Sequence, residues 1–159
     1  MSATSTPQVI TTSNLNFIVG ISGNATNINN ISPTTWSDNI LNDINGNKNI
    51  AKIPFTVSST SDVKYDWDVK ISSLVQTNSN LSGGNISDIK YKVYENKTFI
   101  KGGDISTNEV IVSGTNSSTQ NLSKSYDLYV YIEETDNEQN SLQGISFNVN
   151  LVGNADQIE

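Results

Sequence analysis

The chain has 159 residues and a net charge of −7, it contains no cysteine and no histidine, and all nine of its basic residues are lysine. These absences exclude disulfide bonds, thiolate nucleophiles, zinc sites of the usual kind and every catalytic triad that depends on histidine. An acidic chain without arginine is also a poor nucleic-acid binder, because phosphate contacts need a basic surface. We therefore expect no cofactor and no catalytic residues.

Length and composition favour one folded domain. Only 35% of the residues are hydrophobic, but charged residues make up just 16%, which is not the profile of a disordered chain. No run of about 18 apolar residues is present, so no membrane span is expected. The first residues, Met-Ser-Ala-Thr-Ser-Thr-Pro, lack the basic and apolar parts of a signal peptide. The protein is then either cytosolic or begins after a processed leader, and its surface chemistry favours the second.

Apolar residues alternate with polar ones along most of the chain, and this alternation predicts β-strands with one buried face. Clusters of Asn, Gly and Asp separate the runs and predict turns. Pro54 interrupts the second run and indicates a strand end or an edge strand. The predicted strands cover residues 15–21, 53–57, 63–71, 89–93, 99–100, 110–112, 126–132 and 145–151.

Only one segment, residues 32–41, has a helical pattern. Trp36, Ile40 and Leu41 are spaced for one helical face, and Ser32 followed by Pro33 is a suitable start. We expect one or two turns packed on an edge of the strands.

Many short strands with turn-rich connections and no fixed repeat predict an all-β fold, a jelly-roll-like antiparallel β-sandwich of about eight or nine strands. Residues 13–159 form this single domain, and residues 1–12 form an extended N-terminal segment. The predicted core residues are Phe17, Val19, Phe55, Tyr65, Trp67, Val69, Tyr91, Leu128, Val130, Phe147 and Val149.

Two groups of carboxylates are candidate sites. Glu134, Asp136 and Glu138 lie in an acidic loop that offers oxygens for Ca²⁺, but the spacing of a calcium-binding loop is missing and a solvated turn explains them better. Asp66 and Asp68 share a strand face, where pairing with Lys64 and Lys70 is a simpler explanation than catalysis.

Four aromatic residues fall outside the predicted inward-facing rows. Trp36, Tyr94, Tyr129 and Tyr131 are therefore expected on the surface, where they would stack on glycans, line a subunit contact or have no special role. Among them the pair Tyr129 and Tyr131 is the better interface candidate, together with Trp36.

The chain also contains seven Asn-x-Ser/Thr sequences, which are acceptors for N-glycosylation in suitable hosts. Its richness in Asn, Ser and Thr explains them by composition alone, and glycosylation is expected only for an archaeal or eukaryotic source. The acceptor residues are Asn24, Asn30, Asn80, Asn85, Asn96, Asn116 and Asn121.

The C-terminal stretch carries a resemblance to a known family. Residues 126–132, followed by Asn140-Ser-Leu-Gln143-Gly144-Ile-Ser-Phe147, resemble the closing strands of the TasA/camelysin family of exported biofilm-matrix fibre subunits and related archaeal pilus subunits. The match covers about a fifth of the chain, and the family's opening motif is absent here. The resemblance implies a jelly-roll-like sandwich in which an N-terminal segment of one subunit adds as a strand to its neighbour.

Residues 2–12 suit that role because they are uncharged and β-branched, with Val9, Ile10, Thr11 and Thr12 as the candidate donor strand. A frayed terminus and an ordinary first strand remain alternatives. We thus expect a non-enzymatic structural subunit, extracellular or on the cell surface, that forms a homopolymer and contacts no nucleic acid. Cell-surface or matrix components are further candidate partners. A secreted adhesin or carbohydrate-binding β-sandwich is the alternative, and an enzyme using carboxylates is a distant third.

Overall fold

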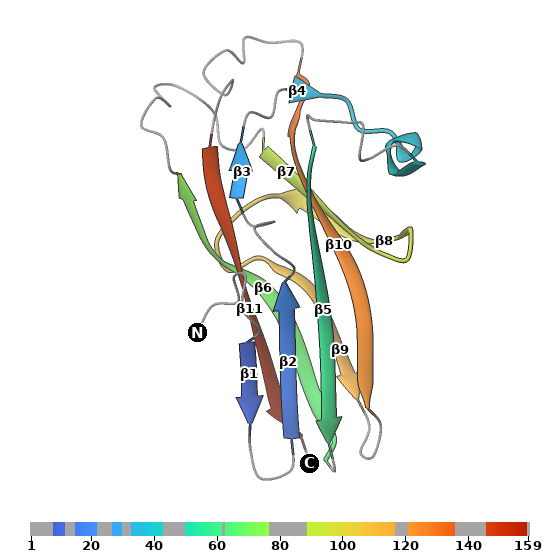
Figure 1. Ribbon diagram of the computed structural model, residues 1–159, viewed down its shortest axis with the longest axis vertical. Coiled ribbons are helices and arrows are strands. Elements are labelled where there is room, and N and C mark those ends of the chain that lie inside the picture. The colour runs from blue at the N-terminus through green and yellow to red at the C-terminus, as the bar shows by residue number, and fades with distance from the viewer. Residues whose placement is uncertain are drawn as a thin grey trace.

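The protein is a two-sheet β-sandwich (Figure 1). The computed structural model describes residues 8–11, 15–21, 27–29, 33–42, 50–61, 63–76, 89–116, 121–135 and 146–158. Every strand pairing among them is antiparallel except a two-residue parallel contact between β4 and β10. The all-β sandwich predicted from alternation is therefore confirmed.

The larger sheet has the order β1-β2-β5-β10-β7-β8, with β4 beside β10, and the smaller has the order β3-β11-β6-β9. A short 3-10 helix, η1 (Asp38–Asn42), follows β4. The strands of the larger sheet are β1 (Gln8–Thr11), β2 (Leu15–Ile21), β4 (Pro33–Thr34), β5 (Ala51–Ser61), β7 (Ile89–Glu95), β8 (Thr98–Asp104) and β10 (Leu122–Glu133). Those of the smaller are β3 (Asn27–Asn29), β6 (Tyr65–Gln76), β9 (Val110–Asn116) and β11 (Ser146–Gln157).

The core lies between the two sheets and is built from the apolar rows of the sequence. In β2 and β5 every second residue is buried, as a strand with one inward face requires. All the predicted core residues are buried there, apart from Phe147, whose side chain lies outside the described part. The rings of Phe17 on β2 and Trp67 on β6 meet across the core with centroids 6.1 Å apart.

A buried hydrogen bond also joins the sheets. Tyr65 on β6 is fully buried, and its hydroxyl is hydrogen-bonded to the Ser59 hydroxyl on β5. The Leu122 backbone N–H donates to the same Ser59 oxygen at 3.3 Å. Because a buried hydroxyl without a partner costs about 1–3 kcal/mol, this small network lets a tyrosine fill the core.

Two glycines permit close packing inside the sandwich. A Cβ atom on Gly153 of β11 would lie 2.4 Å from Val19 and 2.8 Å from Phe17, so the smaller sheet approaches β2 closely only because this side chain is missing. Gly114 on β9 is the register partner of Trp67, and a Cβ there would lie 2.8 Å from the indole nitrogen. The indole therefore covers the glycine on the inner face.

Pro54 lies in an interior strand, although the sequence suggested a strand end or an edge. Strand β5 pairs with β10 along residues 51–59, and Pro54 is opposite Asp127. On the other side, pairing with β2 starts only at Phe55. Pro54 therefore lies beyond the end of β2, so its missing N–H leaves no gap in the β2–β5 ladder.

Candidate functional site

A second apolar cluster covers the outer face of the larger sheet. It consists of Tyr94 on β7 and Tyr129 and Tyr131 on β10, which are each no more than 4% exposed. Trp36 lies over all three, with ring centroids 6.0, 5.6 and 5.1 Å away. The other members are Ile40, Leu41 and Ile50.

The prediction that these tyrosines are exposed is wrong. The segment of residues 33–42, which contains β4 and η1, crosses the outer face of the sheet and buries them, while Trp36 itself is partly exposed. The helical spacing of Trp36, Ile40 and Leu41 was the signal for this contact, since an apolar helical face needs an apolar partner. Tyr129 and Tyr131 are therefore covered and do not form an open interface in this structure.

Polar contacts hold the covering segment in place. Both the Tyr94 hydroxyl and the Trp36 indole N–H donate to Asp38 Oδ1, at 3.0 and 3.3 Å. Burial, reinforced by Asp38, raises the pKa of Tyr94. The Lys92 amine lies 5.5 Å from the Trp36 ring centroid and 5.2 Å from that of Phe99, within the range of cation–π attraction.

The buried tyrosines are held in the neutral form. Burial raises the pKa of Tyr129 to about 12, with Asp127 and Tyr94 adding to the effect. Burial likewise raises the pKa of Tyr131 to about 12, with help from Glu133 and Tyr94. None of these phenols is therefore tuned to act as an acid or base near neutral pH.

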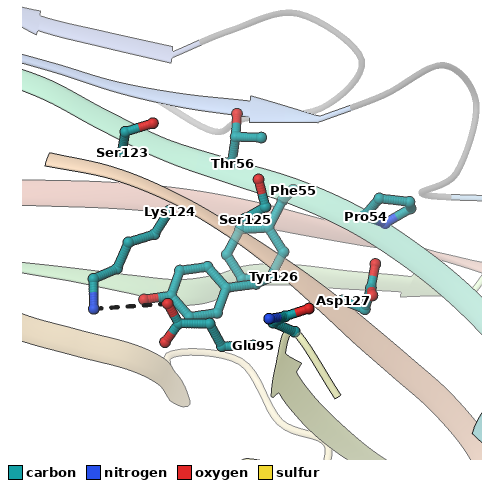
Figure 2. A pocket seen from close by; sticks show the side chains of 10 residues that line it. Pro54, Phe55, Thr56, Glu95, Ser123, Lys124, Ser125, Tyr126 and Asp127 are labelled. Carbon is teal, nitrogen blue, oxygen red and sulfur yellow. Dashed lines mark ion pairs between the residues drawn. The ribbon is translucent and has the colours of Figure 1, made fainter. Parts of the chain in front are cut away.

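Figure 2 shows an open pocket of about 440 Å³ beside β10. It lies where β7 ends, since β10 pairs with β7 only from Asp127 onward. The stacked rings of Phe55 and Tyr126, 5.2 Å apart, line the pocket, and Lys124 and Glu95 form an ion pair of 3.8 Å. Burial and then Glu95 raise the pKa of Tyr126 to about 12. The pocket thus offers two stacked aromatic rings beside an ion pair of opposite charges.

The carboxylates Asp66 and Asp68 lie on the outer face of the smaller sheet. Thr115 donates to Asp66 at 2.5 Å and Asn154 donates to Asp68 at 3.3 Å, while Asp66 is the register partner of Asp156. The expected pairing with Lys64 and Lys70 does not occur among the ion pairs of the described residues. Hydroxyl and amide donors on the flanking strands contact these carboxylates instead.

The candidate donor strand lies on its own fold in this structure. Strand β1 pairs with β2 from Gln8 opposite Val19 to Thr11 opposite Asn16, at one end of the larger sheet. This arrangement is the ordinary first strand that the sequence left open as an alternative. Val9, Ile10 and Thr11 belong to it, and Thr12 lies outside the described residues.

Strand β8 forms the opposite end of the larger sheet (Figure 1). Phe99 is 51% exposed and Ile100 is 43% exposed, and they are the exposed large hydrophobic residues of the described part. Strand β8 also contacts β9, and the Lys101 amine donates to the Val110 carbonyl at 2.7 Å and lies 4.0 Å from Glu109. The sequence suggested a strand piece here but not its position at an edge.

Few of the remaining candidate residues are described. Asn96 and Asn121 are exposed, and Asn116 is partly buried at the end of β9, whereas Asn24, Asn30, Asn80 and Asn85 lie outside the described residues. Of the calcium candidates Glu134 is exposed, and Asp136 and Glu138 also lie outside. Within the described part, no three or more acidic residues are placed to hold a metal ion.

No helix in the described part is long and apolar enough to cross a membrane. Comparisons with protein-family models, with curated proteins and with solved structures found no match.

Proposed function

We propose that this protein is a structural subunit that assembles with copies of itself into an extracellular filament, by addition of its N-terminal segment to a neighbouring subunit. The observation that carries the proposal is the open larger sheet, which ends in β1 on one side and β8 on the other. An edge strand presents unpaired N–H and C=O groups that pair readily with a strand from another chain.

The N-terminal strand is well suited to this contact. Strand β1 is four residues long, it carries no charged residue, and β2 is its one partner strand among those described. Its contact with a second copy would join two different surfaces of the same chain. Such a head-to-tail contact repeats without closing and produces a filament.

Sequence features support the extracellular location of the proposed filament. The resemblance of residues 126–132 and 140–147 to exported fibre subunits supports the same role.

Electron microscopy of purified, concentrated protein tests the proposal. The full chain is expected to form filaments, and the chain without residues 2–12 is expected to fold but not polymerise. Replacing Val9 and Ile10 with Asp is expected to have the same effect, because a charge on a strand that packs against apolar side chains of the neighbouring subunit would be left unpaired. Thr56→Asp is a matched control, since Thr56 is exposed on the interior strand β5. Filaments of normal diameter from the truncated chain would show that assembly uses another surface.

A binding function is the second candidate, and one observation favours it. A hollow of about 340 Å³ on the outer face of the larger sheet is lined by Phe99 and Tyr131 and by charged residues that include Lys90 and Glu133. An aromatic ring beside polar groups is a suitable surface for a sugar. A glycan array with the wild-type chain and Phe99→Ala separates this function from assembly, because only a binding module loses a glycan signal with that substitution.

A further inference from the structure

The two ends of the larger sheet differ in a way that makes them complementary. Strand β1 is short and uncharged, and strand β8 exposes two adjacent large apolar side chains, Phe99 and Ile100. Phe99 is the register partner of Tyr94, and its ring lies 5.5 Å from the Tyr94 ring on the outer face of the sheet. Ile100 is the extra residue at an irregularity in this pairing and adds a second exposed apolar side chain to the edge. Val9 and Ile10 of β1 are an equivalent adjacent pair in the sequence.

Only part of β8 is open to another strand. In the second half of β8, the Lys101 side chain contacts Val110 at the start of β9 and the preceding Glu109. The first half, Thr98–Ile100, pairs with β7 through Thr98 and Phe99 and has no strand on its other side among those described. The open part is therefore close in length to the four residues of β1.

Charge indicates that the partner is a second copy of this chain. The hairpin of β7 and β8, residues 89–104, has four lysines and two carboxylates and hence a net charge of +2. The rest of the chain has five lysines and fourteen carboxylates and hence −9. A basic edge on an acidic molecule is attracted to the remainder of an identical molecule, and this attraction weakens with salt.

We infer that the acceptor for the N-terminal strand is the edge Thr98–Ile100 of β8 in a neighbouring copy, and that β1 keeps its pairing with β2 while it binds there. This inference rests on the proposed function and specifies its acceptor. A strand has two edges, so β1 can pair with β2 on one side and with the neighbour's β8 on the other. The larger sheet would then continue from copy to copy along the filament.

Disulfide trapping tests the acceptor directly, because the chain has no cysteine of its own. Single-cysteine proteins with V9C or I10C are mixed with single-cysteine proteins with F99C or I100C, so that two adjacent positions are sampled on each strand. A second mixture joins T11C with N16C, the register partners of the β1–β2 pair, and reports exchange of β1 onto the neighbour's β2.

Filaments that contain cross-links between V9C or I10C of one copy and F99C or I100C of another copy support the inference. Filaments with cross-links only in the T11C and N16C mixture overturn it, since the acceptor would then be β2 while the proposed function stands. Absence of filaments from the wild-type chain at every salt concentration overturns the proposed function and the inference together.

Substitution of the edge gives an independent test. Phe99→Lys with Ile100→Lys is expected to abolish filaments, because charged side chains on an edge strand prevent pairing with another chain. The unfolding midpoint is expected to fall only slightly, since Phe99 is 51% exposed, Ile100 is 43% exposed, and Phe99 packs on one side against Tyr94. Thr56→Lys is the matched control and is expected to assemble normally. Normal filaments from the doubly substituted chain would overturn the inference.

Discussion

Three tyrosines, Tyr126, Tyr129 and Tyr131, have surroundings that favour their neutral form. Burial raises each pKa from 10.0 to about 12. The folded state therefore holds these protons more tightly than the unfolded chain. Their contribution to stability is fully present below pH 10 and is lost as the pH rises through about 12.

Tyr126→Phe tests this effect, because it removes one titrating group and leaves the stacking partner Phe55 in place. We expect the free energy of unfolding of the wild type to fall between pH 10 and pH 12 by roughly 2 kcal/mol more than that of the variant. Urea unfolding of both proteins over this range measures the difference. Parallel curves for the two proteins would show that Tyr126 ionises as freely in the folded state as in the unfolded chain.

At the scale of elements, the chain's two tryptophans belong to different structures. Trp67 is buried in the core of the sandwich, and Trp36 is a partly exposed cover on the outer face. We expect Trp67→Ala to lower the free energy of unfolding by about 3–5 kcal/mol through a core cavity, and Trp36→Ala to lower it by about 2 kcal/mol or less.

Urea unfolding gives both free energies, and limited proteolysis locates the change. Trp36→Ala is expected to speed cleavage within residues 33–42 while the sandwich stays intact, because Tyr94, Tyr129 and Tyr131 lose the ring that covers them. An equal decrease in the free energy of unfolding for the two substitutions would mean that residues 33–42 unfold together with the sandwich.

The longer strands could be predicted from the sequence because each has one buried face. Residues 15–21 and 89–93 alternate regularly and form β2 and most of β7. Strands β3 and β4 have only three and two residues, which is too short for a period to appear. Strand β8 was recognised only at Phe99 and Ile100, because an edge strand that is mostly exposed on both faces and contains Gly102 and Gly103 has no regular alternation.

The candidate sites are harder to predict, because an alternation pattern does not show which segments of the chain contact each other. The uncharged, β-branched residues of the segment indicate a strand, but the sequence pattern alone does not show that this strand pairs with β2 of the same chain. Alternation shows which tyrosines face away from the core and therefore predicts them on the surface, but it cannot show that Trp36, from a distant part of the chain, covers them.

At the scale of the whole molecule, the separation of the sheets depends on Gly153. A methyl group there would overlap Val19 and Phe17, so Gly153→Ala is expected to lower the free energy of unfolding by about 1–3 kcal/mol. Gly20→Ala is the control, because its new methyl group would meet only the Thr56 hydroxyl, at 3.0 Å. Thermal unfolding measures both, and an unchanged midpoint for Gly153→Ala would show that the sheets can move apart without cost.

The positions of β10 and β11 determine when this protein can fold. They are the last two strands of the chain, yet β10 lies between β5 and β7, and β11 lies between β3 and β6. Until both have left the ribosome, β1, β2 and β5 are separated from β7 and β8, and β3 is separated from β6 and β9. A nascent chain therefore completes neither sheet before β10 and β11 are made, and a copy that is truncated before Leu122 has no route to the native state.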